Sequence, residues 1–152
     1  KTVYDNLTIE AGAAEVENTD AGENDVATNE PITTDKGFVT VTPAGGFIYD
    51  EAQSDKSSLA FTNTSLGANA AVYVYDEQSM EYEVQKRQFG YAYPNKEYST
   101  VTIGANTFDA IESNTGVTYL VAKTSTGNAM YVMVWSCSVA DATPLIETIV
   151  IN

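Results

Sequence analysis

Hydrophobic and polar residues alternate with a period of two along most of the chain from Gly37 onward, and turn residues interrupt the alternation often. Successive side chains of a β-strand point to opposite faces, so this alternation predicts strands with one buried face. The expected strands are 38–42, 58–63, 70–75, 80–84, 98–103, 117–123, 129–139 and 145–151. No stretch carries a convincing 3.6-residue period, and we predict no helix.

Glycine, asparagine and serine mark the connections between these strands. The stretch 124–128 predicts a hairpin between strands 117–123 and 129–139. Seven or eight short strands, rich in Val, Thr and Tyr, predict an all-β fold, either an antiparallel β-sandwich or a jelly roll. We expect this domain to span residues 37–152.

The strand at 129–139 is apolar on both faces. One face carries Met130, Val132 and Val134, and the other carries Tyr131, Met133 and Trp135. Two interpretations follow: a central strand covered on both sides, or a strand with one face in the core and the other in a subunit interface. We expect the terminal strand 145–151 to pair within its own sheet, because a bare β-branched edge promotes aggregation.

The first 36 residues differ from the rest in composition. They hold nine carboxylates, two lysines and a single aromatic residue, Tyr4. So little apolar surface does not offset the entropy of ordering the segment. We therefore predict an extended acidic N-terminal arm over 1–36, held by neighbouring subunits, before a β-sandwich domain over 37–152.

The net charge of −14 limits the possible partners. An acidic surface repels phosphate backbones and anionic membranes, so nucleic-acid binding is not expected. No apolar run reaches the length of a membrane span. The first residue is lysine rather than methionine, which predicts a processed chain. A virion surface or the extracellular space is the expected location.

The counts of histidine and cysteine exclude several kinds of catalysis. The chain has no histidine and one cysteine, Cys137, which excludes His-dependent triads and an internal disulfide. We expect Cys137 to be a buried structural thiol. Paired carboxylates remain as candidates for acid and base roles, but alternating glutamates are common on solvated strands, and we predict no enzymatic activity. The candidate pairs are Glu81 with Glu83, Asp50 with Glu51, and Asp76 with Glu77.

A metal site has only compositional support. Residues 18–25 are dense in oxygen ligands of the kind that calcium prefers, but their spacing fits neither the EF-hand loop nor the glycine-rich calcium repeats. We favour a solvated acidic loop over a specific calcium site. We predict no cofactor, and calcium has no specific motif here.

Aromatic and basic residues gather in a predicted long loop after residue 85. Tyrosines of this kind occur both in protein interfaces and in carbohydrate-binding platforms. The doublet Lys86-Arg87 is a candidate binding site for the acidic arm of a neighbouring copy. The apolar residues of that arm alternate only poorly. The full set of candidate assembly residues is Val3, Leu7, Ile9, Lys86, Arg87, Phe89, Tyr91, Tyr93, Tyr131, Met133 and Trp135.

The order of segments over roughly 57–135 resembles a known group of viral proteins. It runs from Ser58–Ser65 through Ala70–Tyr75 and Ser99–Ala105 to Thr118–Val121 paired with Tyr131–Val134. This order is similar to that of the small β-sandwich decoration and accessory proteins of tailed-phage capsids. The resemblance implies a virion structural protein whose arm lies across neighbouring capsomers, and it carries over no functional residue.

Three function classes follow from these observations. The first is a non-enzymatic protein that decorates or cements a capsid, with copies of itself and a larger capsid or surface protein as partners. The alternative is a subunit of an extracellular filament or pilus, in which Lys1–Glu17 or Leu145–Ile151 adds a strand to the next copy. The second alternative is a secreted carbohydrate-binding or adhesin module.

Overall fold

The computed structural model describes residues 25–26 and 30–152 of the chain. Eight strands form a large sheet: β1 (Asp25–Val26), β4 (Ile48–Asp50), β5 (Ser58–Thr62), β6 (Ala71–Glu81), β7 (Ser99–Ile103), β8 (Asn106–Glu112), β9 (Thr118–Lys123) and β10 (Asn128–Trp135). A small sheet holds β2 (Ile32–Thr33), β3 (Val39–Val41) and β11 (Val150–Ile151). Both sheets are antiparallel and pack together, which confirms the predicted all-β, sandwich-like class.

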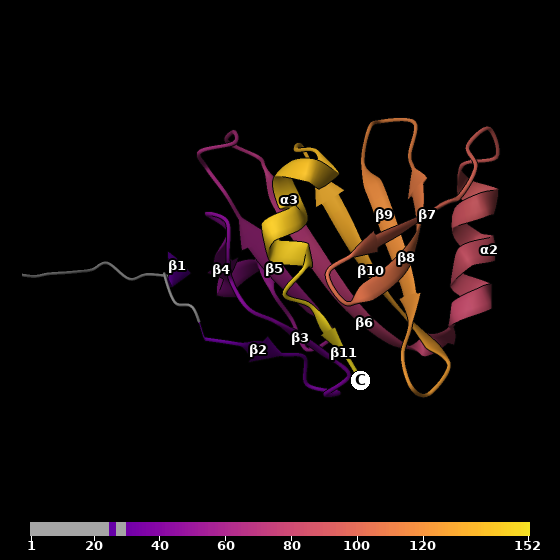
Figure 1. Ribbon diagram of the computed structural model, residues 1–152, viewed down its shortest axis with the longest axis horizontal. Coiled ribbons are helices and arrows are strands. Elements are labelled where there is room, and N and C mark those ends of the chain that lie inside the picture. Colours follow the sequence, from indigo (N-terminus) through magenta and orange to yellow (C-terminus); the bar gives the residue numbers. More distant parts are fainter. Residues whose placement is uncertain (1–24, 27–29) are drawn as a thin grey trace, which may run out of the picture.

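Three helical segments complete the part of the chain that the structure describes. They are the 3₁₀ helix η2 (Glu51–Gln53) and the α-helices α2 (Tyr82–Ala92) and α3 (Val139–Ile146). Figure 1 shows α3 and the small sheet on the same side of the large sheet, with α2 at the end where β7, β8 and β9 lie.

Two antiparallel meanders make up most of the large sheet. Its order is β1-β4-β5-β6-β10-β9-β8-β7, so β4 to β6 form one meander and β7 to β10 form the other. The two meet where β6 pairs with β10, with Val74 opposite Val132. Helix α2 lies in the connection from β6 to β7. This order differs from the two Greek keys of a jelly roll, which was one of the two predicted topologies.

The hydrophobic core lies between the large sheet and the layer of β3, β11 and α3. Alternate residues of the central strands point into it, because the side-chain period of a strand is two. The predicted inward set Met130, Val132 and Val134 is fully buried. The core also contains Val39, Val41, Phe61, Val72, Val74, Phe108, Leu120, Leu145 and Ile146.

The prediction of no helix is wrong at two places. At the first, the expected strand 80–84 stops at Glu81, and the chain enters α2 at Tyr82. Tyr82, Gln85, Phe89 and Tyr93 recur at helical spacing, and the rings of Phe89 and Tyr93 lie against β9. Packing of this stripe on the sheet outweighs the local alternation of Tyr82 and Val84.

The second error concerns the end of the chain. Ser138 begins α3 with a capping box: its hydroxyl accepts from the Asp141 N–H at 3.0 Å, and the Asp141 carboxylate accepts from the Ser138 N–H at 3.4 Å. The expected strand 145–151 is therefore reduced to β11. The expectation that the terminal strand pairs within its own protein is confirmed, because Ile151 lies opposite Val39.

The described residues of the predicted arm contribute two short strands. β1 pairs with β4 in the large sheet, and β2 pairs with β3 in the small sheet. The arm residues Val3, Leu7 and Ile9 lie outside the described part of the chain, as do residues 18–24 of the acidic stretch.

A buried carboxylate ties the segment after β2 to the large sheet. Asp76 of β6 is fully buried and accepts hydrogen bonds from the Thr34 hydroxyl at 2.5 Å, the Phe38 N–H at 3.3 Å and the Gln78 amide at 2.8 Å. Buried carboxylates need such donors, since removing them from water is costly. Asp76 thus holds the β2–β3 connection in place.

No helix in the described residues combines the length and the apolarity needed to cross a membrane.

Candidate functional site

The outer face of the large sheet, turned away from α3 and the small sheet, is rich in aromatic residues. The register places Tyr73 opposite Met133 and Tyr75 opposite Tyr131 on the neighbouring strands β6 and β10. Trp135 follows on the same face of β10. The predicted strand 129–139 ends at Trp135 in the structure, with the set Met130, Val132 and Val134 in the core.

Helix α2 covers one half of this outer face. Phe89 stacks on Tyr119 with ring centroids 4.4 Å apart and meets Tyr131 edge-on at 5.3 Å. Tyr93 lies 5.9 Å from Tyr119 and Tyr75 stacks on Tyr131 at 4.6 Å. Phe89 and Tyr93, expected in a loop, thus hold a helix against the sheet.

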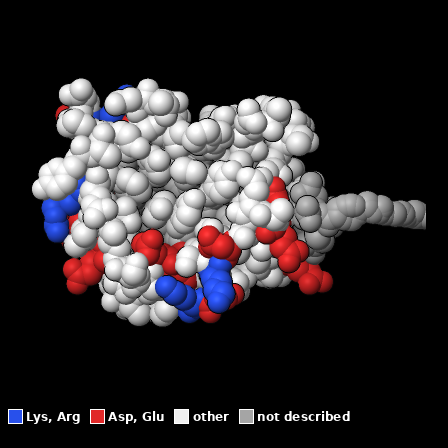
Figure 2. All heavy atoms as spheres, turned by 180° about the vertical axis from the view of Figure 1, so that it is seen from behind, with Lys and Arg blue, Asp and Glu red and all other residues white. Residues whose placement is uncertain are grey.

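The other half of the outer face is open, and we call its residues Tyr73, Met133 and Trp135 the aromatic face. Trp135 is 44% exposed, whereas the small neighbouring residues Ala60 and Ala71 are buried. The Tyr73 hydroxyl donates to the Gln53 side-chain oxygen at 3.3 Å, which places η2 at the border. Figure 2 shows the molecule from this side: Lys, Arg, Asp and Glu gather along its lower part and at one end, and a broad area carries other residues.

Two tyrosines of the outer face, Tyr75 and Tyr131, have pKa values raised above the ordinary tyrosine value. Burial raises the pKa of Tyr131 to about 12, and the neighbouring Tyr75 and Glu77 add to the effect. Burial also raises the pKa of Tyr75, with contributions from Tyr73 and Asp55. A neutral aromatic surface of this kind suits burial against another protein better than acid–base chemistry.

The predicted basic doublet lies on α2, and its two members differ in environment. The Lys86 ammonium is 3.2 Å from the Asp109 carboxylate and 5.2 Å from the centre of the Tyr82 ring. The Tyr82 hydroxyl donates to the same carboxylate. Burial, followed by this hydrogen bond, raises the pKa of Tyr82. Lys86 is thus engaged within the fold, whereas Arg87 is exposed.

Arg87 and Tyr91 line an open groove on α2. Tyr91 is 78% exposed. The groove has a volume of about 360 Å³ and is lined by Glu83, Lys86, Arg87, Gly90, Tyr91 and Tyr98. Of the predicted assembly residues within the described part of the chain, the structure therefore brings Tyr131, Met133 and Trp135 to the outer face and places Lys86, Arg87 and Tyr91 at this groove.

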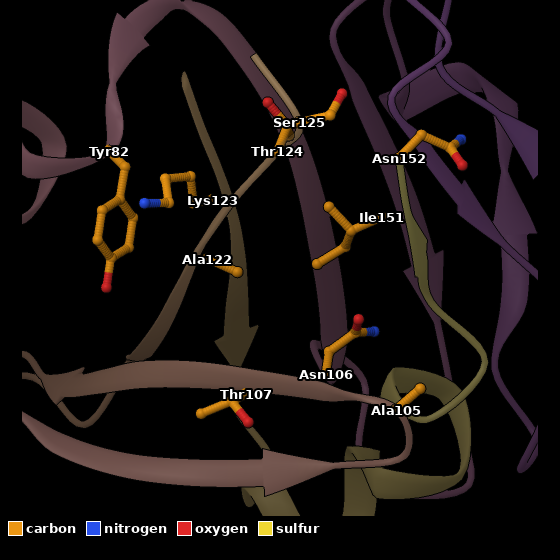
Figure 3. A pocket seen from close by; sticks show the side chains of 10 residues that line it. All are labelled: Tyr82, Ala105, Asn106, Thr107, Ala122, Lys123, Thr124, Ser125, Ile151 and Asn152. Carbon is orange, nitrogen blue, oxygen red and sulfur yellow. The ribbon is translucent and has the colours of Figure 1, made fainter. Parts of the chain in front are cut away.

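A second, polar pocket opens where β8 and β9 diverge (Figure 3). The two strands pair only as far as Asp109 opposite Val121. Beyond this point β8 pairs only with β7, and β9 pairs only with β10, among the described strands. The gap is a cavity of about 510 Å³, which we call the wedge pocket. Its lining residues are Tyr82, Ala105, Asn106, Thr107, Ala122, Lys123, Thr124, Ser125, Ile151 and Asn152.

Sequence reasoning did not identify the wedge pocket. Its residues come from the β7–β8 turn, the end of β9 and the end of the described chain, and no motif joins them. Tyr73, Tyr75 and Tyr119 of the outer face were also missed as site residues. Their alternation along β6 and β9 is the signal that would have found them.

The members of the candidate carboxylate pairs lie in different local environments. Asp76 and Glu77 point to opposite faces of β6, and the change from strand to helix at Tyr82 separates Glu81 from Glu83. Asp50 is buried and accepts from Gln53 at 2.6 Å, whereas Glu51 is exposed. Within the described residues, no three His, Cys, Asp or Glu side chains lie together as metal ligands.

Cys137 lies two residues beyond the end of β10 and is partly exposed, not within the predicted strand. Burial and the nearby Asp141 carboxylate raise the pKa of its thiol. A raised pKa lowers the fraction of reactive thiolate at neutral pH.

Comparisons of the chain with models of protein families, with curated proteins and with solved structures give no match. The function is therefore inferred from the geometry and chemistry of these surfaces.

Proposed function

We propose that the chain is a non-enzymatic structural protein of a virion surface, and that it decorates or cements a capsid by docking its aromatic face on a larger capsid protein. The observation that supports the proposal is the open half of the outer face, with Trp135 at 44% exposure beside Met133 and Tyr73. The resemblance to capsid decoration proteins points to the virion surface as the location.

The aromatic face has the properties of an interface centre. Tryptophan and tyrosine are enriched among the residues that contribute most to protein binding. Here they stand on β6 and β10, the two central strands of the large sheet, so little side-chain and backbone entropy is lost on docking.

Charge identifies the chemistry of the partner. A net charge of −14 opposes the docking of one copy on another through the same face. A neutral or basic surface on a larger protein meets no such repulsion, and its arginines can stack on exposed aromatic rings. We therefore assign the aromatic face to a neutral or basic capsid surface.

The test is the structure of the native particle with and without a change at the face. Trp135→Ser should leave the isolated chain folded and lower its occupancy on the particle. Val150→Ser is the matched control, because Val150 is 52% exposed on the small sheet. A particle in which the aromatic face contacts only solvent would contradict the proposal.

A filament subunit is the second candidate, supported by the free edge of β7. This strand is the last in the large sheet and, within the described residues, pairs only with β8. An edge of this kind accepts an added strand. Leu145–Ile151 is unavailable as the donor, because Leu145 and Ile146 are buried and β11 pairs with β3. A neighbouring copy paired along β7 in an open helix would favour this candidate over the capsid.

A further inference from the structure

The divergence of β8 and β9 creates a candidate binding site in the wedge pocket. Antiparallel neighbours normally close the space between them with a ladder of hydrogen bonds. Here the register ends at Asp109 and Val121, and the continuing residues Thr107 and Lys123 are not paired with each other. The resulting cavity of about 510 Å³ lies within the size range of small-molecule sites.

Lys123 lies at the wedge pocket and has no carboxylate partner among the described residues. The Lys123 ammonium lies 5.6 Å from the centre of the Tyr82 ring, and Figure 3 shows its side chain directed toward that ring. The nearby Asp109 carboxylate is engaged by Lys86 at 3.2 Å and by the Tyr82 hydroxyl. No carboxylate in the described residues lies within 4.0 Å of the Lys123 ammonium. The ammonium is therefore available to an anionic group of a ligand.

Hydroxyl and amide groups line the rest of the pocket. The Asn106 amide nitrogen donates to the Ile149 carbonyl at 2.7 Å, and the Asn152 amide nitrogen donates to the Gly37 carbonyl at 3.2 Å. These bonds orient both side chains and leave their amide oxygens as acceptors. Within the described residues the Ser125 hydroxyl has no hydrogen-bond partner. The lining of the pocket thus includes several acceptors and donors in addition to one cation.

Small apolar side chains complete the lining. Ala105 and Ala122 leave space near the strand ends, and Ile151 adds an apolar patch between the polar groups. A ligand that matches this surface has several hydroxyl groups, a C–H face and one negative charge. Sugars provide the first two, and a carboxylate provides the third.

We propose that the wedge pocket binds a saccharide bearing a carboxylate, of the hexuronic acid type, with the carboxylate on Lys123 and the sugar hydroxyls on Asn106, Ser125 and Asn152. An acidic peptide side chain would use the ammonium but would leave most of the hydroxyl and amide groups without partners, so a sugar is the better match. The site is separate from the aromatic face and does not depend on the proposed docking function.

Titration of the full chain by heteronuclear NMR tests the proposal. Methyl β-glucuronide is the probe, methyl β-glucoside is the same sugar without the carboxylate, and N-acetylglutamate is a carboxylate without the sugar. We expect saturable shifts at the wedge-pocket amides with the glucuronide, and affinities lower by about tenfold or more for the other two probes.

Two variants separate binding at this site from unspecific attraction. Lys123→Gln should weaken glucuronide binding by about tenfold or more, since it removes a charge-assisted hydrogen bond. Lys56→Gln is the matched control, because Lys56 is also exposed but lies before β5, outside the wedge-pocket lining. Far-ultraviolet circular dichroism checks that both variants fold.

Three results would overturn the assignment. The first is the absence of saturable shifts with the glucuronide at millimolar concentration. The second is equal binding by Lys123→Gln and the wild type. The third is N-acetylglutamate binding as tightly as the glucuronide, which would identify a general carboxylate site. None of these results bears on whether Trp135 docks on a capsid.

Discussion

The Lys86 ammonium lies 3.2 Å from the Asp109 carboxylate, and this ion pair joins helix α2 to strand β8. Both side chains are mostly buried, at 25% and 19% exposure. The pair lies beside Tyr82, whose hydroxyl donates to the same carboxylate. A residue predicted to bind a neighbouring copy thus serves to position the helix that covers half of the outer face.

Replacing Asp109 with asparagine should loosen α2 without unfolding the protein. The amide oxygen can still accept from Tyr82, but the ion pair with Lys86 is lost. We expect the free energy of unfolding to fall by about 1 kcal/mol, measured by urea denaturation. Glu112→Gln, an exposed change on the same strand, should have no measurable effect. Equal losses in both variants would contradict a specific role for the pair.

The stability of the fold should decrease above pH 10. Burial raises the pKa of Tyr98 and of Tyr131 to about 12 in each case, whereas the unfolded chain titrates near the ordinary tyrosine value of about 10. Between these values the unfolded chain releases protons that the folded chain retains, so stability is full below pH 10 and falls as the pH rises.

Urea midpoints measured from pH 8 to 12 test this alkaline loss. In the Tyr131→Phe variant the urea midpoint should fall less steeply with pH, because phenylalanine has no hydroxyl to titrate. A midpoint that stays constant to pH 12 in the wild type would show that these hydroxyls do not titrate differently in the two states.

Asp76→Ala should be among the most destabilising single changes on β6. It removes the acceptor of three donors, including the Thr34 hydroxyl at 2.5 Å, and leaves a buried space where the carboxylate stood. We expect a loss of about 3 kcal/mol in the free energy of unfolding. Glu77→Ala, one residue along on the opposite face, should cost less than about 1 kcal/mol. Similar losses would show that the buried network adds little.

Gly104 and Gly127 offer a matched pair of glycines with positive φ, at +64° and +87°. A Cβ at Gly104 would lie 2.7 Å from the Glu147 carbonyl oxygen, whereas one at Gly127 would meet nothing within 4 Å. Alanine at Gly127 should cost about 1 kcal/mol through backbone strain alone. Alanine at Gly104 should cost about 2 kcal/mol more and perturb the adjacent wedge pocket, as seen in denaturation and in amide shifts.

The sequence by itself determined the positions of β3, β5, β7, β9 and β10 and the net charge, whereas β4 and β8 were not predicted. Alternation was sufficient because a strand places every second residue on one face: it separated Val132 from Met133 and predicted the 124–128 hairpin. It also carried a signal for α3 that was overlooked, the spacing of Ser138 and Asp141 in a capping box.

Only the tertiary structure decided that Tyr82 begins a helix and that β8 and β9 stop pairing beyond Asp109 and Val121. Met80, Tyr82 and Val84 alternate as a strand would, but Phe89 and Tyr93 gain more by packing on Tyr119 of a distant strand. The wedge pocket has the same kind of origin, since Lys123 and Asn106 line one cavity only where two strands cease to pair. Local patterns report which face a residue occupies, whereas contacts between segments far apart in the chain set which surfaces are covered and which stay open.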